Sequence, residues 1–187
     1  MLSFSTTKES TMKHIARIAV TTALALAGAA AHAQYYVEGA YTPTTIKIED
    51  GAKLKPAMLS ATVGYDLHPN FAVEAMLGLG AKKDSATDGT NSGSIKYKHA
   101  YGVYLKPRYQ LSQEFEIFGR AGFTHGKLEG SDSTGGNGNV SGGTFSWGLG
   151  GNYAIDKQLY LTASYMNFYK KDGLKIDGFN LGVGYKF

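Results

Sequence analysis

Residues 57–80, AMLSATVGYDLHPNFAVEAMLGLG, contain the clearest pattern in the chain. Up to Leu67, apolar residues at the odd positions alternate with small or polar residues, and the alternation returns from Phe71 onward. Successive side chains of a β-strand point to opposite faces, so each half predicts a strand with one apolar face and one small or polar face. The intervening His68-Pro69-Asn70 is typical of a tight turn, and the whole stretch therefore predicts a β-hairpin.

Six further segments show the same alternation less cleanly: residues 35–42, 95–109, 115–125, 144–155, 159–169 and 178–187. The connections at 67–70, 111–114 and 156–158 are short, whereas 43–56, 82–94, 129–143 and 170–177 are longer and rich in Gly, Ser, Asp and Lys. Short turns at one end and long polar loops at the other are typical of outer-membrane barrels, whose turns are periplasmic. We expect an all-β, eight-stranded antiparallel up-and-down transmembrane β-barrel with both termini periplasmic.

The N-terminal 33 residues have the pattern of a signal peptide. A basic region at residues 12–17 precedes an apolar run at residues 18–31, and Ala31-His32-Ala33 is a small-x-small cleavage site. The run is too short for a transmembrane anchor, which needs about 20 apolar residues. We expect cleavage between Ala33 and Gln34, which leaves residues 34–187 as the barrel domain. Met1 and Met12 both remain possible starts of translation.

Composition excludes several classes of function. Of 19 basic and 15 acidic residues, the first 33 positions hold three basic and one acidic, which leaves 16 against 14 in the barrel domain. Such a small, dispersed excess is not the footprint of a nucleic-acid-binding protein. The chain has no cysteine, and neither His68 nor His99 has a partner at metal-ligand spacing. We therefore expect no metal site and no cofactor.

Two features distinguish a membrane barrel from a soluble one such as a lipocalin, which faces its polar residues outward. The non-apolar face of the hairpin is mainly small and polar, which suits a narrow polar lumen better than a soluble exterior. Aromatic residues also gather at strand ends on the apolar face, as in membrane-interface girdles. The predicted periplasmic girdle is Tyr35, Tyr65, Phe71, Tyr109, Phe115 and Tyr153, and the predicted outer set is Tyr41, Tyr97, Phe123, Phe145, Tyr165 and Phe179.

Charged residues of both signs fall on the inward face: Glu38, Asp66, Glu74, Lys106, Glu116, Arg120 and Lys186. Counting from the turns places Glu38, Glu74, Lys106 and Arg120 at comparable depth. Eight strands enclose just enough space for side chains, so we expect these four to form an ionic cluster that plugs the lumen. The alternative is a narrow, porin-like ion channel.

The last ten residues, 178–187, alternate Phe179, Leu181, Val183, Tyr185 and Phe187 with small or polar residues and end on an aromatic residue. They resemble the C-terminal strand of the small outer-membrane barrel superfamily that includes the OmpX/Ail, opacity-protein and OmpA-barrel groups. Shorter similarities, such as Val63-Gly64-Tyr65 and Trp147-Gly148-Leu149-Gly150, extend the resemblance along residues 34–187. It implies a Gram-negative outer membrane, contact with its lipid and lipopolysaccharide, and recognition of Tyr185 and Phe187 by the barrel-assembly machinery.

The resemblance further implies surface integrity or adhesion through the extracellular loops. Lipid A-modifying enzymes are an alternative in the same superfamily, but their deacylase pattern needs a serine two residues after a histidine, and His125 is followed by Lys127 there. We therefore expect no catalytic residues. Lysines in or beside the loops predict contact with lipopolysaccharide phosphates or an acidic host-surface glycan. They are Lys53, Lys55, Lys82, Lys83, Lys127, Lys170, Lys171 and Lys175.

Overall fold

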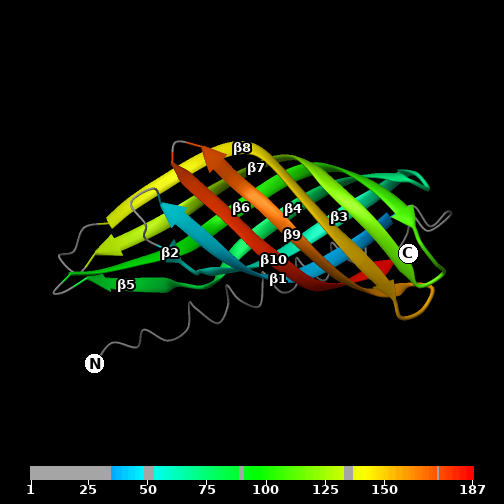
Figure 1. Cartoon of the computed structure of the whole chain (residues 1–187), viewed down its shortest axis with the longest axis horizontal. Helices are drawn as coiled ribbons and strands as arrows, with labels where there is room; N and C mark the ends of the chain where they lie inside the picture. Colours follow the sequence, from blue (N-terminus) through cyan, green and yellow to red (C-terminus); the bar gives the residue numbers. More distant parts are fainter. Residues whose placement is uncertain (1–34, 49–52, 89–90, 133–136, 172) are drawn as a thin grey trace, which may run out of the picture. The chain divides into compact units, whose positions relative to one another are not determined.

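The computed structural model describes residues 35–48, 53–88, 91–132, 137–171 and 173–187, which are all-β (Figure 1). The strands are β1 (Tyr35–Ile48), β2 (Lys53–Leu54), β3 (Ala57–His68), β4 (Phe71–Lys82), β5 (Asp84–Asp88), β6 (Asn91–Gln110), β7 (Phe115–Asp132), β8 (Asn137–Ala154), β9 (Leu159–Lys171) and β10 (Leu174–Lys186). Within these ranges no helix is long and apolar enough to cross a bilayer.

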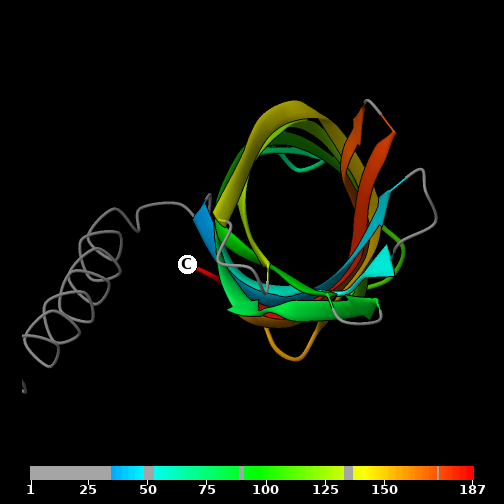
Figure 2. The same cartoon turned by 90° about the vertical axis from the view of Figure 1, so that its left-hand side faces the viewer.

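Eight of the strands close into a ring, seen end-on in Figure 2. The order around the ring is β1, β3, β4, β6, β7, β8, β9 and β10, every pairing is antiparallel, and β10 returns to pair with β1. The short strands β2 and β5 add to β1 and β6 at one end. The predicted eight-stranded antiparallel barrel is confirmed.

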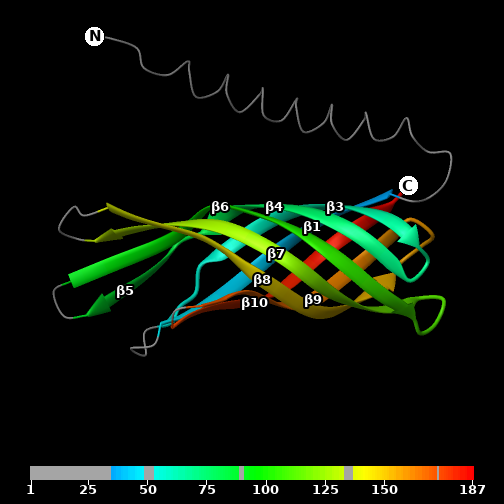
Figure 3. The same ribbon diagram turned by 90° about the horizontal axis from the view of Figure 1, so that it is seen from above.

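The two ends of the barrel differ in how the strands are connected. At one end, here called the turn end, short turns join β3 to β4, β6 to β7 and β8 to β9. At the other, the hairpin end, β5 to β8 reach farther than the β9–β10 hairpin (Figure 3).

The predicted long loops at the hairpin end are wrong, because most of their residues continue the strands. β1 runs to Ile48, β7 runs to Asp132 and β8 starts at Asn137, and β7 and β8 stay in register out to Ser131↔Asn137. Pairing across each hairpin satisfies the backbone N–H and C=O groups even where the side chains are polar or glycine. Between β9 and β10, Gly173 has a φ of 73°, which favours glycine and allows a tight turn in place of a loop.

The barrel wall is apolar on the outside. Leu77 and Phe123 are each 69 % exposed, whereas the inward Glu74 and Lys106 are 2 % and 1 % exposed. A soluble domain does not present a continuous belt of exposed large apolar side chains to water. The alternation predicted from residues 57–80 therefore places its apolar face outward.

A bulge in β6 reverses this alternation near the hairpin end. Tyr97 pairs with Leu128 and His99 with Lys127, so Lys98 is an additional residue in the register. Tyr97 consequently points into the barrel, where its hydroxyl donates a hydrogen bond to Thr44 Oγ1 at 3.1 Å. The prediction that Tyr97 belongs to the outer aromatic set is wrong, because one additional residue in a strand exchanges its two faces.

The interior has two chemically different halves. Toward the turn end it holds buried ions, but toward the hairpin end it holds an apolar cluster, contrary to the expectation of a polar lumen. The cluster consists of Ile46, Leu54, Met58, Met76, Tyr97, Ala100, Tyr104, Met166, Phe168 and Ile176. Its large side chains come partly from irregular strands, since Phe168, like Tyr97, lies at a register shift.

One turn gives a pH-dependent prediction. Asp156 accepts hydrogen bonds from the backbone N–H groups of Leu159 and Gln158, which hold the pKa of its carboxyl below the ordinary value. This stabilisation is complete above the unfolded-state pKa of about 4 and disappears as the pH falls through the lower native pKa. When the pH falls from about 6 to about 2, the urea unfolding midpoint of the wild-type barrel should therefore drop further than that of Asp156→Ala. Equal losses in the two proteins would contradict this role of the turn.

Candidate functional site

Four buried charged side chains meet inside the barrel, in the half nearer the turn end. Lys106 Nζ lies 2.9 Å from Glu38 Oε1 and 3.0 Å from Glu74 Oε1. Arg120 reaches the other oxygen of each carboxylate, with Nη2 at 2.5 Å from Glu38 Oε2 and Nε at 2.5 Å from Glu74 Oε2. The structure thus brings together the four residues that sequence counting placed at comparable depth, and we call them the ionic cluster.

The ionic cluster contains two carboxylates and two cations and links strands β1, β4, β6 and β7. Its charges balance when all four groups are ionised. Each carboxylate faces both cations at low exposure, so neither sign is left alone in an environment with little water. The arrangement can fix these strands against one another and fill the cross-section of the lumen.

Two tyrosines complete the cluster and were missed by sequence reasoning. Tyr36 donates its hydroxyl proton to Glu74 Oε1 at 2.7 Å, and Tyr160 donates to Glu38 Oε1 at 2.9 Å. The Tyr36 ring also lies 4.7 Å from Lys106 Nζ, a cation–π contact. The signal was present in the sequence, because Tyr36 is two residues before Glu38 and therefore shares its inward face.

Glycines opposite these tyrosines provide the space for their rings. A Cβ atom added to Gly64 would lie 2.0 Å from Tyr36 Cζ, and one added to Gly184 would lie 2.1 Å from Tyr160 Cζ. Both distances are far shorter than any real carbon contact, so a larger residue at either position would displace the tyrosine ring. These glycines let a narrow barrel hold large hydrogen-bonding side chains.

A second ionic group lies closer to the turn end. Arg108 Nη2 is 2.7 Å from Asp66 Oδ2, and Arg108 Nε is 3.7 Å from Glu116 Oε2. Asn152 donates a further hydrogen bond to Glu116 Oε1 at 2.8 Å. Sequence analysis named both carboxylates but missed Arg108, although its separation of two from Lys106 gives it the same inward face.

Lysines form a row across four adjacent strands at the hairpin end. Direct cross-strand pairing connects Lys53 of β2, Lys47 of β1, Lys175 of β10 and Lys170 of β9, and we call these four residues the lysine row. Directly opposite residues share a face of the sheet, so the four side chains project from the same side of the wall. Asp177 lies beside the row, 3.0 Å from Lys175 Nζ and 4.0 Å from Lys47 Nζ.

The charge of the lysine row exceeds that of its carboxylate partner. Asp177 is the only carboxylate among the described residues within 4.0 Å of these lysines, so four positive charges share one negative charge. On β6, by comparison, only two lysines share one carboxylate. Glu129 lies 2.9 Å from Lys98 Nζ and 3.3 Å from Lys96 Nζ. The row is therefore the denser basic site among the described strands.

The sequence matches the family model described as outer membrane protein beta-barrel domain over residues 16–187. The chain belongs to this family. No curated protein sequence matches it significantly. The exposed apolar wall and the closed ring agree with this membership, and the protein is an outer-membrane β-barrel of the type found in Gram-negative bacteria.

Solved structures of small outer-membrane barrels share the fold. Ail of Yersinia pestis, in complex with the heparin analogue sucrose octasulfate, aligns with a TM-score of 0.62 at 22 % identity, covering 82 % of this chain and 98 % of Ail. Neisserial surface protein A aligns with a TM-score of 0.63 at 12 % identity over 82 % and 97 % of the two chains. The N-terminal barrel of OprF from Pseudomonas aeruginosa gives 0.53 at 17 %, over 83 % and 100 %. Identities this low establish the fold alone.

The six residues predicted to form the periplasmic girdle of this outer-membrane barrel all lie near the turn end. In two cross-strand pairs the rings meet in a tilted arrangement, Tyr35 with Tyr65 at 4.7 Å and Phe115 with Tyr153 at 4.9 Å between centroids. Phe71 and Tyr109 are 45 % and 62 % exposed on the outside. Aromatic rings in such positions suit the boundary between lipid and water.

The remaining predicted positions lie at the chain ends. Tyr185 lies near the turn end of β10 and pairs with Val37 and Leu159. Lys186 pairs with Tyr36 one residue farther, and Phe187 follows this final strand residue. Ala31, Ala33 and Gln34, the predicted signal peptidase site, lie outside the described residues, as does the whole of the predicted signal peptide.

His125 of the outer-membrane barrel stacks on the ring of Tyr101. Its ring centroid lies 5.2 Å from that of Tyr101, with 27° between the planes. The parts of the chain that the structure describes contain no group of three or more His, Cys, Asp or Glu residues able to hold a metal ion.

Proposed function

We propose that this outer-membrane barrel is a surface protein that binds sulfated or phosphorylated glycans at its hairpin end. The lysine row is the observation that carries the proposal. Like charges placed directly opposite on neighbouring strands destabilise a sheet. Among the described residues the four lysines share a single carboxylate, that of Asp177, so the row has an unfavourable self-energy that a polyanion relieves.

The comparison with Ail supports the chemical class of the ligand. Ail was crystallised with sucrose octasulfate, a heparin analogue. That complex shows what a barrel of this fold accommodates, and we transfer to this chain only the chemistry of a dense polyanion. Adhesion to acidic host-surface glycans and contact with lipopolysaccharide phosphates are both expressions of this chemistry.

The proposed function requires an orientation in the membrane. We propose that the hairpin end is extracellular and that the turn end and both termini are periplasmic, as in other bacterial barrels with short periplasmic turns. Tyr185 and Phe187 then lie on the side where the barrel-assembly machinery would read them. The lysine row, in turn, lies on the outer-leaflet side, beside lipopolysaccharide.

We further propose that the barrel is a closed scaffold and not an enzyme or an open channel. The ionic cluster spans the lumen with paired charges, which favours a plug over an ion pathway. His125 is engaged with Tyr101 and is followed by Lys127 where the deacylase pattern has serine.

Charge removal from the lysine row gives a direct test. Lys47→Gln with Lys170→Gln should weaken binding of the detergent-solubilised barrel to immobilised heparin roughly tenfold at low salt, because both cross-strand repulsion and ligand attraction depend on these charges. Barrel stability should stay equal or rise slightly. The matched control is Lys96→Gln with Lys98→Gln, which removes the same charge from β6. Equal weakening by both pairs, or binding that does not respond to salt, would exclude the lysine row as the site.

Purified lipopolysaccharide, added as a competitor, separates the two sources of anionic ligand. Displacement of the barrel from heparin by lipopolysaccharide supports one shared site. Failure to displace leaves the acidic glycan as the ligand.

A further inference from the structure

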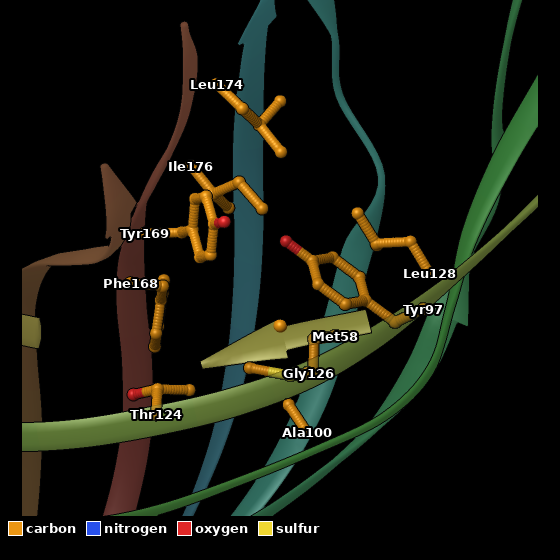
Figure 4. Close-up of a pocket in the computed structure, with 11 residues that line it drawn as sticks. Met58, Tyr97, Ala100, Thr124, Gly126, Leu128, Phe168, Tyr169, Leu174 and Ile176 are labelled. Atoms are coloured by element: carbon orange, nitrogen blue, oxygen red, sulfur yellow. The ribbon is translucent and has the colours of Figure 1, made fainter. Parts of the chain in front are cut away.

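The outer wall of the barrel has a hollow of the size of a ligand site. The apolar half of the lumen has no comparable space, since Met58, Tyr97 and Phe168 converge there on only about 50 Å³ (Figure 4). The hollow on the outside has a volume of about 500 Å³ and lies over β8, β9 and β10, in the half nearer the turn end. Ligand pockets in proteins are typically about 300–1,000 Å³ and mostly apolar.

The floor of this hollow is a pair of small residues. Gly151 of β8 lies directly opposite Ala163 of β9, so the two share the outward face. The next outward pair toward the turn end is Tyr153↔Leu161, and both of these large residues line the hollow as well. The wall is therefore thinner at the small pair than at the pair beside it.

Large side chains also bound the floor in the other directions. The next outward pair toward the hairpin end is Leu149↔Tyr165. On the flanking strands, Ile117 of β7 and Leu181 of β10 lie directly opposite the two floor residues. We call the space above the floor the wall hollow. It is bounded by large apolar or aromatic side chains on all four sides.

The position of the wall hollow indicates what covers it. The chain is an outer-membrane β-barrel, and its exposed apolar face is the surface that such barrels present to lipid. The wall hollow is continuous with this face, and none of the described residues that line it is charged. Apolar atoms that face an empty space lose their dispersion contacts. The occupant that fits is an uncharged, flexible aliphatic chain.

Tyr153 indicates how the chain is oriented. Its ring lies 4.9 Å from that of Phe115, in the aromatic girdle near the turn end. A girdle tyrosine places its ring in the apolar region and its hydroxyl at the polar boundary, where the ester carbonyl groups of phospholipids also lie. We infer that the wall hollow binds one acyl chain of an ester-linked phospholipid, whose carbonyl group accepts a hydrogen bond from Tyr153. The lysine row, at the other end of the barrel, takes no part in this site.

Retention of lipid by the full-length protein tests this assignment. The protein is reconstituted in nanodiscs of palmitoyl-oleoyl phosphatidylethanolamine, transferred to dodecyl maltoside and measured by native mass spectrometry. The wild type should retain one phospholipid molecule per barrel, because a chain in the wall hollow has more protein contacts than lipid elsewhere on the wall. A wild-type barrel that retains no phospholipid would overturn the inference.

A filled hollow supplies the matched comparison. Ala163→Phe places a ring on the floor and should lower the retained fraction roughly tenfold, because the chain loses its contacts with the wall. Ala75→Phe adds the same ring to the outward face of β4, where Ala75 is exposed between Val63 and Val103, and should leave retention unchanged. Equal retention by the two variants would show that the lipid is bound elsewhere.

An ether-linked phosphatidylethanolamine, which lacks the ester carbonyl groups, tests the hydrogen bond. The wild type should retain the ether lipid about threefold less than the ester lipid, the usual effect of losing one hydrogen bond. Tyr153→Phe should retain both lipids equally, whereas Tyr109→Phe, changed at another girdle tyrosine, should behave as the wild type. Equal retention of the two lipids by the wild type would overturn the role assigned to Tyr153.

The same spectra give the mass of the protein assembly. A monomer that carries lipid supports the inference, whereas a wild-type dimer that Ala163→Phe separates into monomers would assign the wall hollow to a second copy and overturn it. Heat-modifiable gel mobility reports whether each variant is a folded barrel. If Ala163→Phe does not fold, the smaller Ala163→Leu takes its place with Ala75→Leu as its control.

Discussion

Replacing Arg120 with alanine is expected to lower the free energy of unfolding by about 3–5 kcal/mol, the usual cost of removing one partner from a buried ion pair. Arg120 contacts both Glu38 and Glu74, so its loss leaves two buried carboxylates facing the single cation Lys106. The change should appear as a lower urea unfolding midpoint and a lower temperature at which the folded gel band disappears.

An exposed ion pair provides the control for this prediction. Lys98 lies 2.9 Å from Glu129, but its side chain is 51 % exposed, so Lys98→Ala should cost about 0–1 kcal/mol. Adding Glu74→Gln to Arg120→Ala should restore part of the lost stability, because the remaining Glu38 and Lys106 balance. The role assigned to the ionic cluster is wrong if Arg120→Ala unfolds at the same urea concentration as Lys98→Ala.

Substituting Gly64 with alanine is expected to destabilise the barrel by about 1–3 kcal/mol, the range for overpacking a filled interior. The added methyl group would lie 2.0 Å from the Tyr36 ring, which must move and thereby lose its hydrogen bond to Glu74. The carboxylate of Glu74 then loses a hydrogen-bond donor in a buried site, which adds to the steric cost.

Gly39→Ala is the matched control, since a Cβ atom there has no atom within 4 Å and points outward from the neighbouring strand β1. Its unfolding midpoint should match the wild type. Fluorescence or NMR of Tyr36 should change in Gly64→Ala alone. A midpoint for Gly64→Ala equal to that of Gly39→Ala would show that Tyr36 does not need the space beneath it.

Much of the fold could be predicted because every strand of a barrel follows one local rule, the alternation of inward and outward side chains. The period of two in residues 57–80 assigns each side chain to a face without any knowledge of neighbouring strands. The same rule placed Glu38, Glu74, Lys106 and Arg120 on the inside, and a count from the turns gave their depth. Arg108 and Tyr36 obeyed the rule too and were available to the same reasoning.

The exceptions arise where the local rule is broken. The bulge beside Tyr97 and the register shift at Phe168 each add one residue, and nothing in the local sequence distinguishes that residue from its neighbours. Both turn an aromatic ring inward, which helps to make half of the lumen apolar. The extension of strands through glycine- and serine-rich segments was missed for a related reason, since pairing with the partner strand, and not side-chain pattern, keeps those segments extended.

By itself, the sequence determined the strand number, the outward apolar face and the inward set of charges, because each of these follows from alternation within a single strand. Only the tertiary structure decided which distant residues stand opposite one another. Lys47 meets Lys175 because β1 pairs with β10, and the pairing of β8 with β9 ends at Trp147 and Asn167. The register between strands depends on closure of the whole ring, and so the lysine row and the apolar cluster appear only when the barrel is complete.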